Sequence, residues 1–193
     1  TKGNTRPRSE HRWWALIALA LAQFLVVMDS SIINIALPTI GDDLQIGTDT
    51  LSWIIAAFVV PFGGLLLLGG RLADRFGHRR IFLLGIFGFI LGSTAAGMST
   101  TLAWILIARA VQGMAAALLA PAALALLTVL FTEPAERAKA LGVWGIVAGV
   151  GSGAGVLLGG VVTSMFGWSS VFFINIPVGA VVLMATPMLV TKD

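Results

Sequence analysis

Two formal charges, Asp29 and Arg109, stand inside long apolar stretches of this sequence. A charged side chain at the centre of a bilayer costs roughly 2.5–3.5 kcal/mol on insertion scales, so such residues are usually paired or functional. A carboxyl group can lose and regain a proton, whereas a guanidinium stays protonated and holds a negative partner. These residue types therefore predict an ion pair or a proton-exchange site.

The depths of the two charges in the membrane can be compared by counting along their segments. Asp29 lies about sixteen residues, or about 23 Å of α-helix, from the inner end of the first segment. Arg109 lies about 18 Å from the inner face of a hydrocarbon core roughly 30 Å thick. The two can pair or share a cavity if their helices are neighbours. A purely structural pair, or an Asp29 that reaches the outer headgroups, is the alternative.

Six apolar segments contain these residues and fill most of the chain. A spanning helix needs about 20 mainly apolar residues. The predicted spans are residues 13–37, 51–70, 79–97, 102–127, 138–162 and 170–190. Of the 193 residues, 58% are hydrophobic and 11% are charged, and a soluble domain of this size cannot hide so much apolar surface. We therefore predict an all-α membrane protein with six transmembrane helices.

The Lys and Arg residues indicate which ends of the spans face the cytoplasm. Of the twelve, all but Arg109 lie in the tail 1–12, in the connections 71–80 and 137–139, or in the terminal segment 191–193. Because Lys and Arg collect on the cytoplasmic side, we expect a multi-pass protein of the cytoplasmic membrane with both termini inside and a cytoplasmic connection starting at 191–193. The net charge of +3 then reflects topology and contact with anionic lipid, and no nucleic acid is expected as a partner.

Composition also limits the chemistry. The chain has no cysteine, which excludes disulfides, thiolate metal sites and cysteine nucleophiles. Both histidines fall in predicted cytoplasmic segments, and no metal-ligand cluster or activated nucleophile is recognisable. We expect no enzyme, no metal and no cofactor.

An internal repeat relates the two halves of the chain. Residues 69–77 (GGRLADRFG) recur as residues 159–167 (GGVVTSMFG), with the Gly-Gly and Phe-Gly pairs at the same spacing. Because an odd number of helices separates the copies, one loop is predicted inside and the other outside. Such an inverted repeat of three helices plus three is typical of secondary transporters. The alternative is coincidence in a chain with 23 glycines.

The loop from Gly70 to Arg80 is the strongest local motif. Its sequence, GRLADRFGHRR, resembles the signature loop between helices two and three of the major facilitator superfamily, with His78 in place of a usual Arg or Lys. In that family the loop makes charge contacts that bias inward-facing against outward-facing states. The resemblance implies this role for Gly70, Asp74, Arg75, Gly77, Arg79 and Arg80. Charge counting alone needs only a topogenic cytoplasmic loop.

Three further motifs resemble the fourteen-helix drug:proton antiporters of this superfamily. They are residues 25–38 (LVVMDSSIINIALP), residues 109–113 (RAVQG) and residues 168–179 (WSSVFFINIPVG). In the last motif Ser169 and Ser170 replace the usual Arg-Trp. The resemblance implies the N-terminal six-helix bundle of a major facilitator fold.

The fifth predicted span carries glycines at helical spacing. They form two series, Gly145, Gly149 and Gly153, and Gly151, Gly155 and Gly159. Glycines four residues apart let helix backbones approach closely. They resemble the antiporter motif of the fifth helix, although Ser152 or Ala154 stands where proline is expected. Ordinary helix packing is the alternative to a gating role.

The resemblance implies proton-coupled efflux of amphipathic drugs or toxic compounds by alternating access. Asp29 would exchange the proton beside Arg109 and Gln112, and Gln23, Ser30 and Asn34, which share one helical stripe, would line the same cavity. The proton gradient would supply the energy. A second, C-terminal helical bundle would be the partner of this one, packing on the glycines of the fifth span.

Two other functions stay open at this point. The loop of residues 70–80 is shared with major facilitator symporters and uniporters for metabolites. A non-transporting membrane subunit could use the glycines of the fifth span to bind a partner.

Overall fold

The computed structural model describes residues 9–191, which form seven helices and no strand. The helices are α1 (Ser9–Leu44), α2 (Thr48–Phe76), α3 (His78–Gly97), α4 (Leu102–Leu130), α5 (Pro134–Phe166), α6 (Ser169–Phe173) and α7 (Asn175–Leu189). Within this range, six helical stretches are long and apolar enough to cross a membrane, the sixth being α6 and α7 together. The prediction of an all-α protein with six spans is confirmed. Most of the predicted tail 1–12 and of segment 191–193 lies outside the described residues.

Proline explains why the sixth span is divided. Residue Ile174 keeps helical angles, with φ −58° and ψ −33°, so the axis continues from α6 into α7. Pro177 has no N–H to donate to the carbonyl of Phe173 four residues earlier. The division between α6 and α7 therefore reflects one missing backbone hydrogen bond and not a break in the helix. By contrast, α1 continues through Pro38 to Leu44, beyond the predicted span, because a helix can project past the hydrocarbon into the headgroup region.

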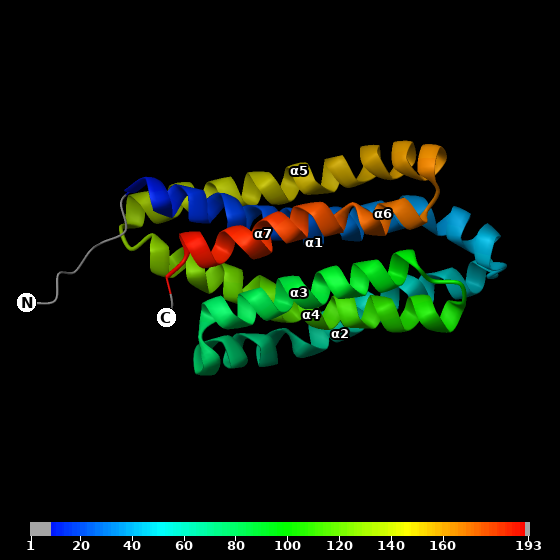
Figure 1. Ribbon diagram of the computed structural model, residues 1–193, viewed down its shortest axis with the longest axis horizontal. Helices are drawn as coiled ribbons and strands as arrows, with labels where there is room; N and C mark the ends of the chain where they lie inside the picture. The colour runs from blue at the N-terminus through cyan, green and yellow to red at the C-terminus, as the bar shows by residue number, and fades with distance from the viewer. Residues whose placement is uncertain (1–8, 192–193) are drawn as a thin grey trace, which may run out of the picture.

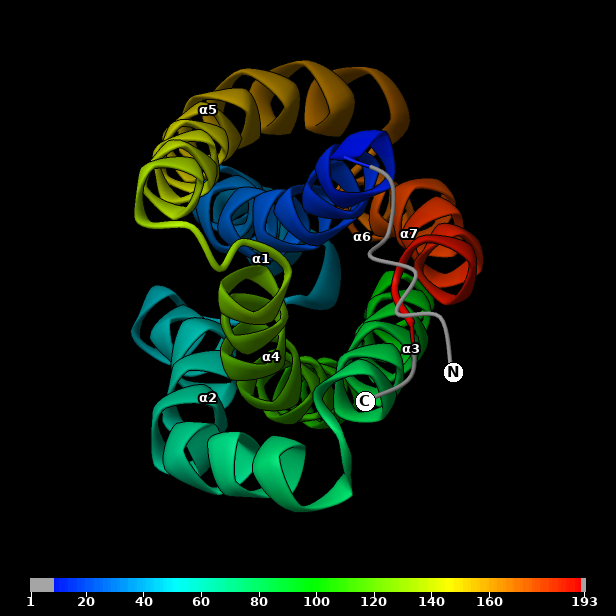
Figure 2. The ribbon, with the colours of Figure 1, turned by 90° about the vertical axis from the view of Figure 1, so that its left-hand side faces the viewer.

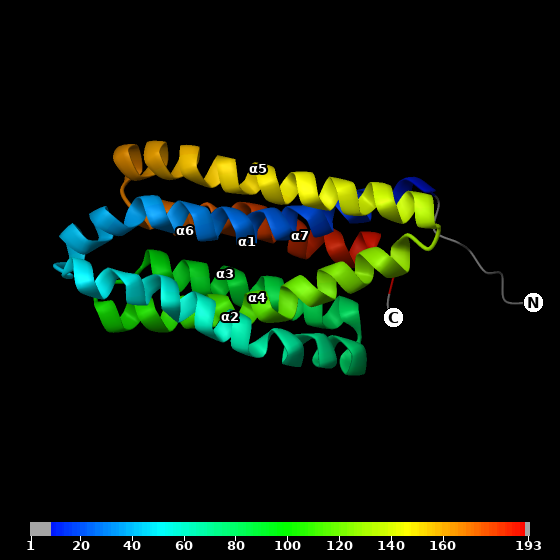
Figure 3. The ribbon, with the colours of Figure 1, turned by 180° about the vertical axis from the view of Figure 1, so that it is seen from behind.

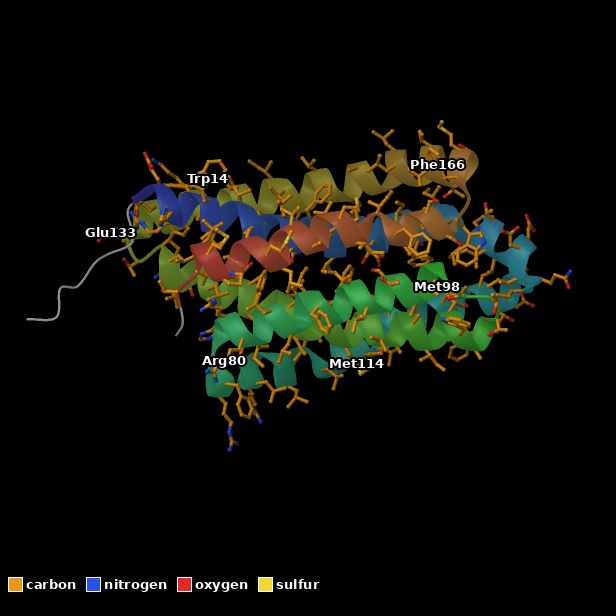
Figure 4. The ribbon with its side chains drawn as sticks, viewed as in Figure 1. Trp14, Arg80, Met98, Met114, Glu133 and Phe166 are labelled. Atoms are coloured by element: carbon orange, nitrogen blue, oxygen red, sulfur yellow. The ribbon has the colours of Figure 1, made fainter. Side chains whose placement is uncertain are left out.

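The helices lie side by side along the long axis of the molecule (Figures 1 and 3). Trp14, Arg80 and Glu133 lie at one end of the bundle, and Met98 and Phe166 lie at the other (Figure 4). The connections that carry Lys and Arg thus share an end, and the connections without a positive charge share the opposite end. This arrangement agrees with the alternation predicted from Lys and Arg.

The two copies of the internal repeat end their helices in the same way. Gly77, after α2, and Gly167, after α5, have positive φ values of 97° and 84°, which favour glycine. The Gly77 N–H bonds to the carbonyl of Ala73 at 3.0 Å, and the Gly167 N–H bonds to that of Thr163 at 3.1 Å. The repeated Phe-Gly pair is therefore a helix end in both copies. These ends lie at opposite ends of the bundle (Figure 1), as an inverted repeat requires.

Helix pairing follows the same relation. Helix α2 packs closely on α4, and α5 packs closely on α1. In the first pair a Cβ added at Gly69 would lie 2.0 Å from the carbonyl oxygen of Ala117, and in the second a Cβ at Gly155 would lie 2.8 Å from that of Met28. Each pair thus brings two backbones together at a glycine.

The glycines of α5 do not form one packing face. Gly151, Gly155 and Gly159 are buried against α1, where an added Cβ would crowd residues between Phe24 and Ile35. Gly145, Gly149 and Gly153 have no atom within 4 Å of an added Cβ. The two predicted series therefore differ: Gly151, Gly155 and Gly159 pack α5 on α1, and the other series is open.

The buried apolar side chains form two clusters. One includes Leu19, Phe82 and Leu126, and the other includes Ile40, Ile105 and Phe172. On α1 the first cluster ends at Met28 and the second begins at Ile32. A layer between the two clusters is thus left for other residues.

Adjacent glycines on α2 offer a matched test of this packing. We expect Gly69→Ala to destabilise the protein by about 1–3 kcal/mol, because the methyl group must displace the backbone of α4. Gly70→Ala should be neutral or stabilising, since its nearest neighbour is the Pro121 Cβ at 3.9 Å. Thermal unfolding of the detergent-purified protein measures both. Equal melting temperatures for the two variants would contradict the close contact.

Candidate functional site

Five buried polar side chains occupy the layer between the two apolar clusters. They are Asp29 of α1, Ser93 of α3, Arg109 and Gln112 of α4, and Asn175 of α7, none more than 1% exposed. All five are joined by hydrogen bonds. We call this set the Asp29 network. It connects four helices at a depth that is otherwise apolar.

The ion pair predicted from depth forms inside this network. Arg109 Nη1 donates to Asp29 Oδ2 at 2.5 Å and to Gln112 Oε1 at 3.0 Å. Both charges are almost fully removed from solvent. A buried pair of this kind tolerates loss of one partner poorly, because the remaining charge is left uncompensated.

The other carboxylate oxygen faces amide donors. Asp29 Oδ1 accepts from Asn175 Nδ2 at 2.9 Å and from Gln112 Nε2 at 3.4 Å. The same two nitrogens donate to Ser93 Oγ, at 3.1 Å from Asn175 and 2.7 Å from Gln112. Asp29 is therefore held by a cation on one oxygen and by neutral donors on the other.

Small residues bring the third and seventh helices close enough for these bonds. A Cβ added at Gly97 would lie 2.5 Å from the Phe173 ring, and one at Gly179 would lie 2.6 Å from Ile90. Gly97 and Ile90 lie on either side of Ser93 on α3. These contacts therefore hold α3 against α6 and α7 on both sides of the Ser93–Asn175 hydrogen bond.

An aromatic ring of α2 covers the guanidinium. The Cζ of Arg109 lies 4.6 Å from the centroid of the Phe58 ring, a cation–π contact. The backbone of Phe58 also touches α4, since a Cβ at Gly113 would lie 2.3 Å from its carbonyl oxygen. Arg109 thus contacts α1 through its ion pair with Asp29 and α2 through the Phe58 ring.

The predicted polar stripe of α1 is separated from the network. Ser30 and Asn34 are exposed, Gln23 is half-buried, and Asn34 Nδ2 donates to the Ser30 carbonyl of its own helix at 2.8 Å. Asp29, in contrast, is fully buried on another side of α1. The prediction of one cavity containing all these residues is therefore wrong, because α1 itself stands between the two groups.

Ser93 and Asn175 are the network residues that sequence reasoning did not select. Asn175 lies in the motif at residues 168–179, so its position was noted but not its chemistry. Ser93 gave no signal beyond being polar in an apolar span. Which polar side chains face Asp29 depends on how each helix is rotated.

The predicted switch loop lies at the end of the bundle that holds the basic residues. His78 Nε2 and Asp74 Oδ1 are 3.1 Å apart, and Arg79 Nη2 donates to the Pro187 carbonyl of α7 at 3.3 Å. A cavity of about 470 Å³ is lined by Asp74, Arg75, Phe76, Gly77, Arg79, Arg80 and Leu83. Gly70 precedes it within α2. In residues 9–191 no three His, Asp or Glu side chains gather as a metal site would require.

Comparison with known proteins gives the family. Residues 19–193 match the Major Facilitator Superfamily. The puromycin resistance protein pur8 of Streptomyces alboniger is 48% identical over 92% of this chain and 35% of its own length. The cephamycin export protein CmcT of Amycolatopsis lactamdurans is 46% identical over 88% of this chain and 35% of its own length. The multidrug resistance protein Stp of Mycobacterium tuberculosis is 38% identical over 89% of this chain and 32% of its own length. The chain thus spans about a third of the length of these relatives.

The ion pair can be tested by stability measurements. We expect Arg109→Gln to destabilise the protein by about 3–5 kcal/mol, because a buried carboxylate loses its counter-charge. Asp29→Asn in addition should recover most of that loss, which a double-mutant cycle measures. Arg12→Gln removes the more exposed pair with Glu136 and should cost about 1 kcal/mol or less. Additive effects at Asp29 and Arg109 would argue against the pair.

Proposed function

The chain belongs to the Major Facilitator Superfamily, and from this we propose that it forms the N-terminal bundle of a proton-coupled exporter of amphipathic compounds. The observation that carries the proposal is the ion pair of Asp29 and Arg109, buried at mid-depth between two apolar clusters. A titratable carboxyl group at that depth is expensive and marks an ion pathway. Relatives named for antibiotic resistance or export favour drugs over metabolites as the transported class.

In the proposed mechanism Asp29 carries the proton. As a carboxylate it binds Arg109 and holds α1 against α4. Protonation removes its negative charge and weakens that attraction, so the helices can rearrange and expose the site to the other side. Release of the proton restores the pair. Because Asp29 is fully buried here, proton entry belongs to a different state of the alternating-access cycle.

The second bundle would cover α2 and α5. Only 11% of the apolar window of α2 and 17% of that of α5 are buried within this chain, and in the end-on view of Figure 2 α5 curves along the upper left and α2 along the lower left, outside α1 and α4. The open glycine series Gly145, Gly149 and Gly153 lets another helix approach α5 closely. A C-terminal bundle placed there would enclose a substrate cavity with the exposed face of α1, including Gln23, Ser30 and Asn34.

Membrane orientation follows from charge on this proposal. Arg12, Arg80 and Arg137 share one end of the bundle with the loop of residues 70–80, which would place that end and the N-terminus in the cytoplasm. The loop would bias the transport states through Asp74, Arg75 and Arg79. The proton gradient would be the energy source, and the chain would catalyse no covalent step.

Transport measurements on the full-length protein test the role of Asp29. We expect Asp29→Asn to abolish proton-driven export, because an amide cannot carry the proton, while substrate exchange at equal pH continues. Asp42→Asn, at the exposed end of the same helix, should leave both activities unchanged. Reconstituted vesicles with an imposed pH gradient separate the two modes. Retention of full proton-driven export by Asp29→Asn would remove Asp29 from the mechanism.

Cysteine labelling tests the orientation, since this chain has no cysteine of its own. In a background without other cysteines, we expect a membrane-impermeant maleimide to label Asp49→Cys in intact cells. Arg75→Cys should be labelled only after the cells are made permeable. Labelling of both from outside would contradict the proposed threading.

A further inference from the structure

We propose that Asn175 is a positioning residue whose side-chain amide rotates when Asp29 gains a proton, and so communicates the charge of Asp29 to α3 and α7. The inference rests on the proposed function, which makes Asp29 the proton carrier. Asn175 lies on the far side of the Asp29 carboxylate from Arg109. The amide has a distinct hydrogen-bond arrangement for each protonation state.

The arrangement seen here fits an ionised Asp29. Asn175 Nδ2 donates one hydrogen to Asp29 Oδ1 at 2.9 Å and the other to Ser93 Oγ at 3.1 Å. Its carbonyl oxygen, Oδ1, is buried and has no hydrogen-bond partner. Buried polar atoms are nearly always bonded, and among the atoms of the Asp29 network only this acceptor and the Nε donor of Arg109 are buried without a partner. The acceptor lies on the amide that contacts the proposed proton carrier.

Protonation of Asp29 changes the hydrogen-bond role that the Asn175 amide must play, from donor to acceptor. A proton added to Asp29 Oδ1 turns that oxygen from an acceptor into an O–H donor, and the Asn175 N–H group loses its partner. Rotation of the amide by a half turn places Oδ1 where Nδ2 was. Oδ1 then accepts from the Asp29 O–H and from the Ser93 hydroxyl, while Nδ2 takes the place that Oδ1 held, where it has no acceptor, so the amide is held less firmly than beside the carboxylate. Asp29 Oδ2 keeps its bond from Arg109, and when the proton leaves, the amide turns back.

Gln112, the other amide of the Asp29 network, cannot make this rotation as cheaply. Its Oε1 accepts from Arg109 Nη1 at 3.0 Å, and its Nε2 donates to Ser93 Oγ at 2.7 Å. A half turn would point its N–H groups at the permanently charged guanidinium. Only Asn175 has an acceptor without a bond, so it is the amide that responds.

No second titratable group competes for this role at the depth of Asp29 in the described chain. Of the helices packed against α1, only α4 places a charge there, on Arg109; α6 and α7 carry none. The charged residues of α2, α3 and α5, and the others of α1, lie toward the helix ends. They are Glu10, His11, Arg12, Asp42 and Asp43 on α1, Asp49, Arg71, Asp74 and Arg75 on α2, His78, Arg79 and Arg80 on α3, and Glu136, Arg137 and Lys139 on α5.

The position of Asn175 allows its rotation to affect the backbone. It is the first residue of α7 and lies two residues after Phe173, whose carbonyl receives no helical hydrogen bond because Pro177 has no N–H. The Phe173–Gly97 and Gly179–Ile90 contacts fix the segment on both sides. A change at Asn175 therefore acts on a part of the sixth span that its own helix holds with one hydrogen bond fewer.

Infrared difference spectroscopy of the full-length transporter, acid minus neutral pH, tests the rotation directly. With asparagine isotopically labelled, the wild type should show a protonated carboxyl band that is missing in Asp29→Asn. It should also show a shifted amide carbonyl band that is missing in Asn175→Leu. Because the wild-type measurement needs no substitution, a poorly folded variant does not block the test. Thr186→Val, which removes a buried hydroxyl of α7 bonded within its own helix, should keep both bands.

Transport supplies the second readout. We expect Asn175→Leu to slow proton-driven export about tenfold, the effect of losing a hydrogen bond to a charged group, while substrate exchange at equal pH is unchanged. If the wild type lacks the Asp29 carboxyl band, the proposed function fails at its proton step. If that band is present but the amide band is absent, or if Asn175→Leu exports like Thr186→Val, only the present inference fails.

Discussion

The packing of the whole bundle depends on a single desolvated ion pair. Asp29 and Arg109 lie where neither water nor lipid headgroups can solvate them, so every lone pair and proton of theirs needs a protein partner. Gln112 of α4 and Asn175 of α7 bond directly to the pair, and Ser93 of α3 accepts from both of their amides. The apolar interior is consequently split into two clusters with a polar layer between them, and the helices have to meet at that layer in one register.

Close backbone contact is what allows short polar side chains to meet across the bundle. Within lipid, helices gain little from the hydrophobic effect and associate through tight packing and hydrogen bonds. Gly69, Gly113 and Gly155 bring α2 to α4 and α1 to α5, and Gly97 and Gly179 bring α3 to α6 and α7. Packing and polar bonding thus depend on each other, because a serine or an asparagine reaches its partner only when the backbones are this close.

The sequence was sufficient to predict properties that depend only on position along the chain. Hydropathy and charge can be read residue by residue along the chain, so the six spans and the alternation of basic ends were predictable. The rise of an α-helix per residue placed Asp29 and Arg109 at similar depth. Rotation of each helix about its axis is set by packing with its neighbours. For that reason Ser93 and Asn175 were not identified as partners of Asp29, Asn34 was assigned to the wrong group, and the sequence did not show which glycine series of α5 is buried against α1.

The matching ends of α2 and α5 bear on the ancestry of the fold. Gly77 and Gly167 end the two helices with the same backbone geometry, and these helices end at opposite ends of the bundle. Two such copies can share one ancestral sequence only if neither is committed to one direction of insertion, and a strongly basic loop commits its helix pair to one direction. Residues 69–77 carry two arginines and one aspartate, whereas residues 159–167 carry no charge, so the charge of the loop is the feature in which the two copies differ most.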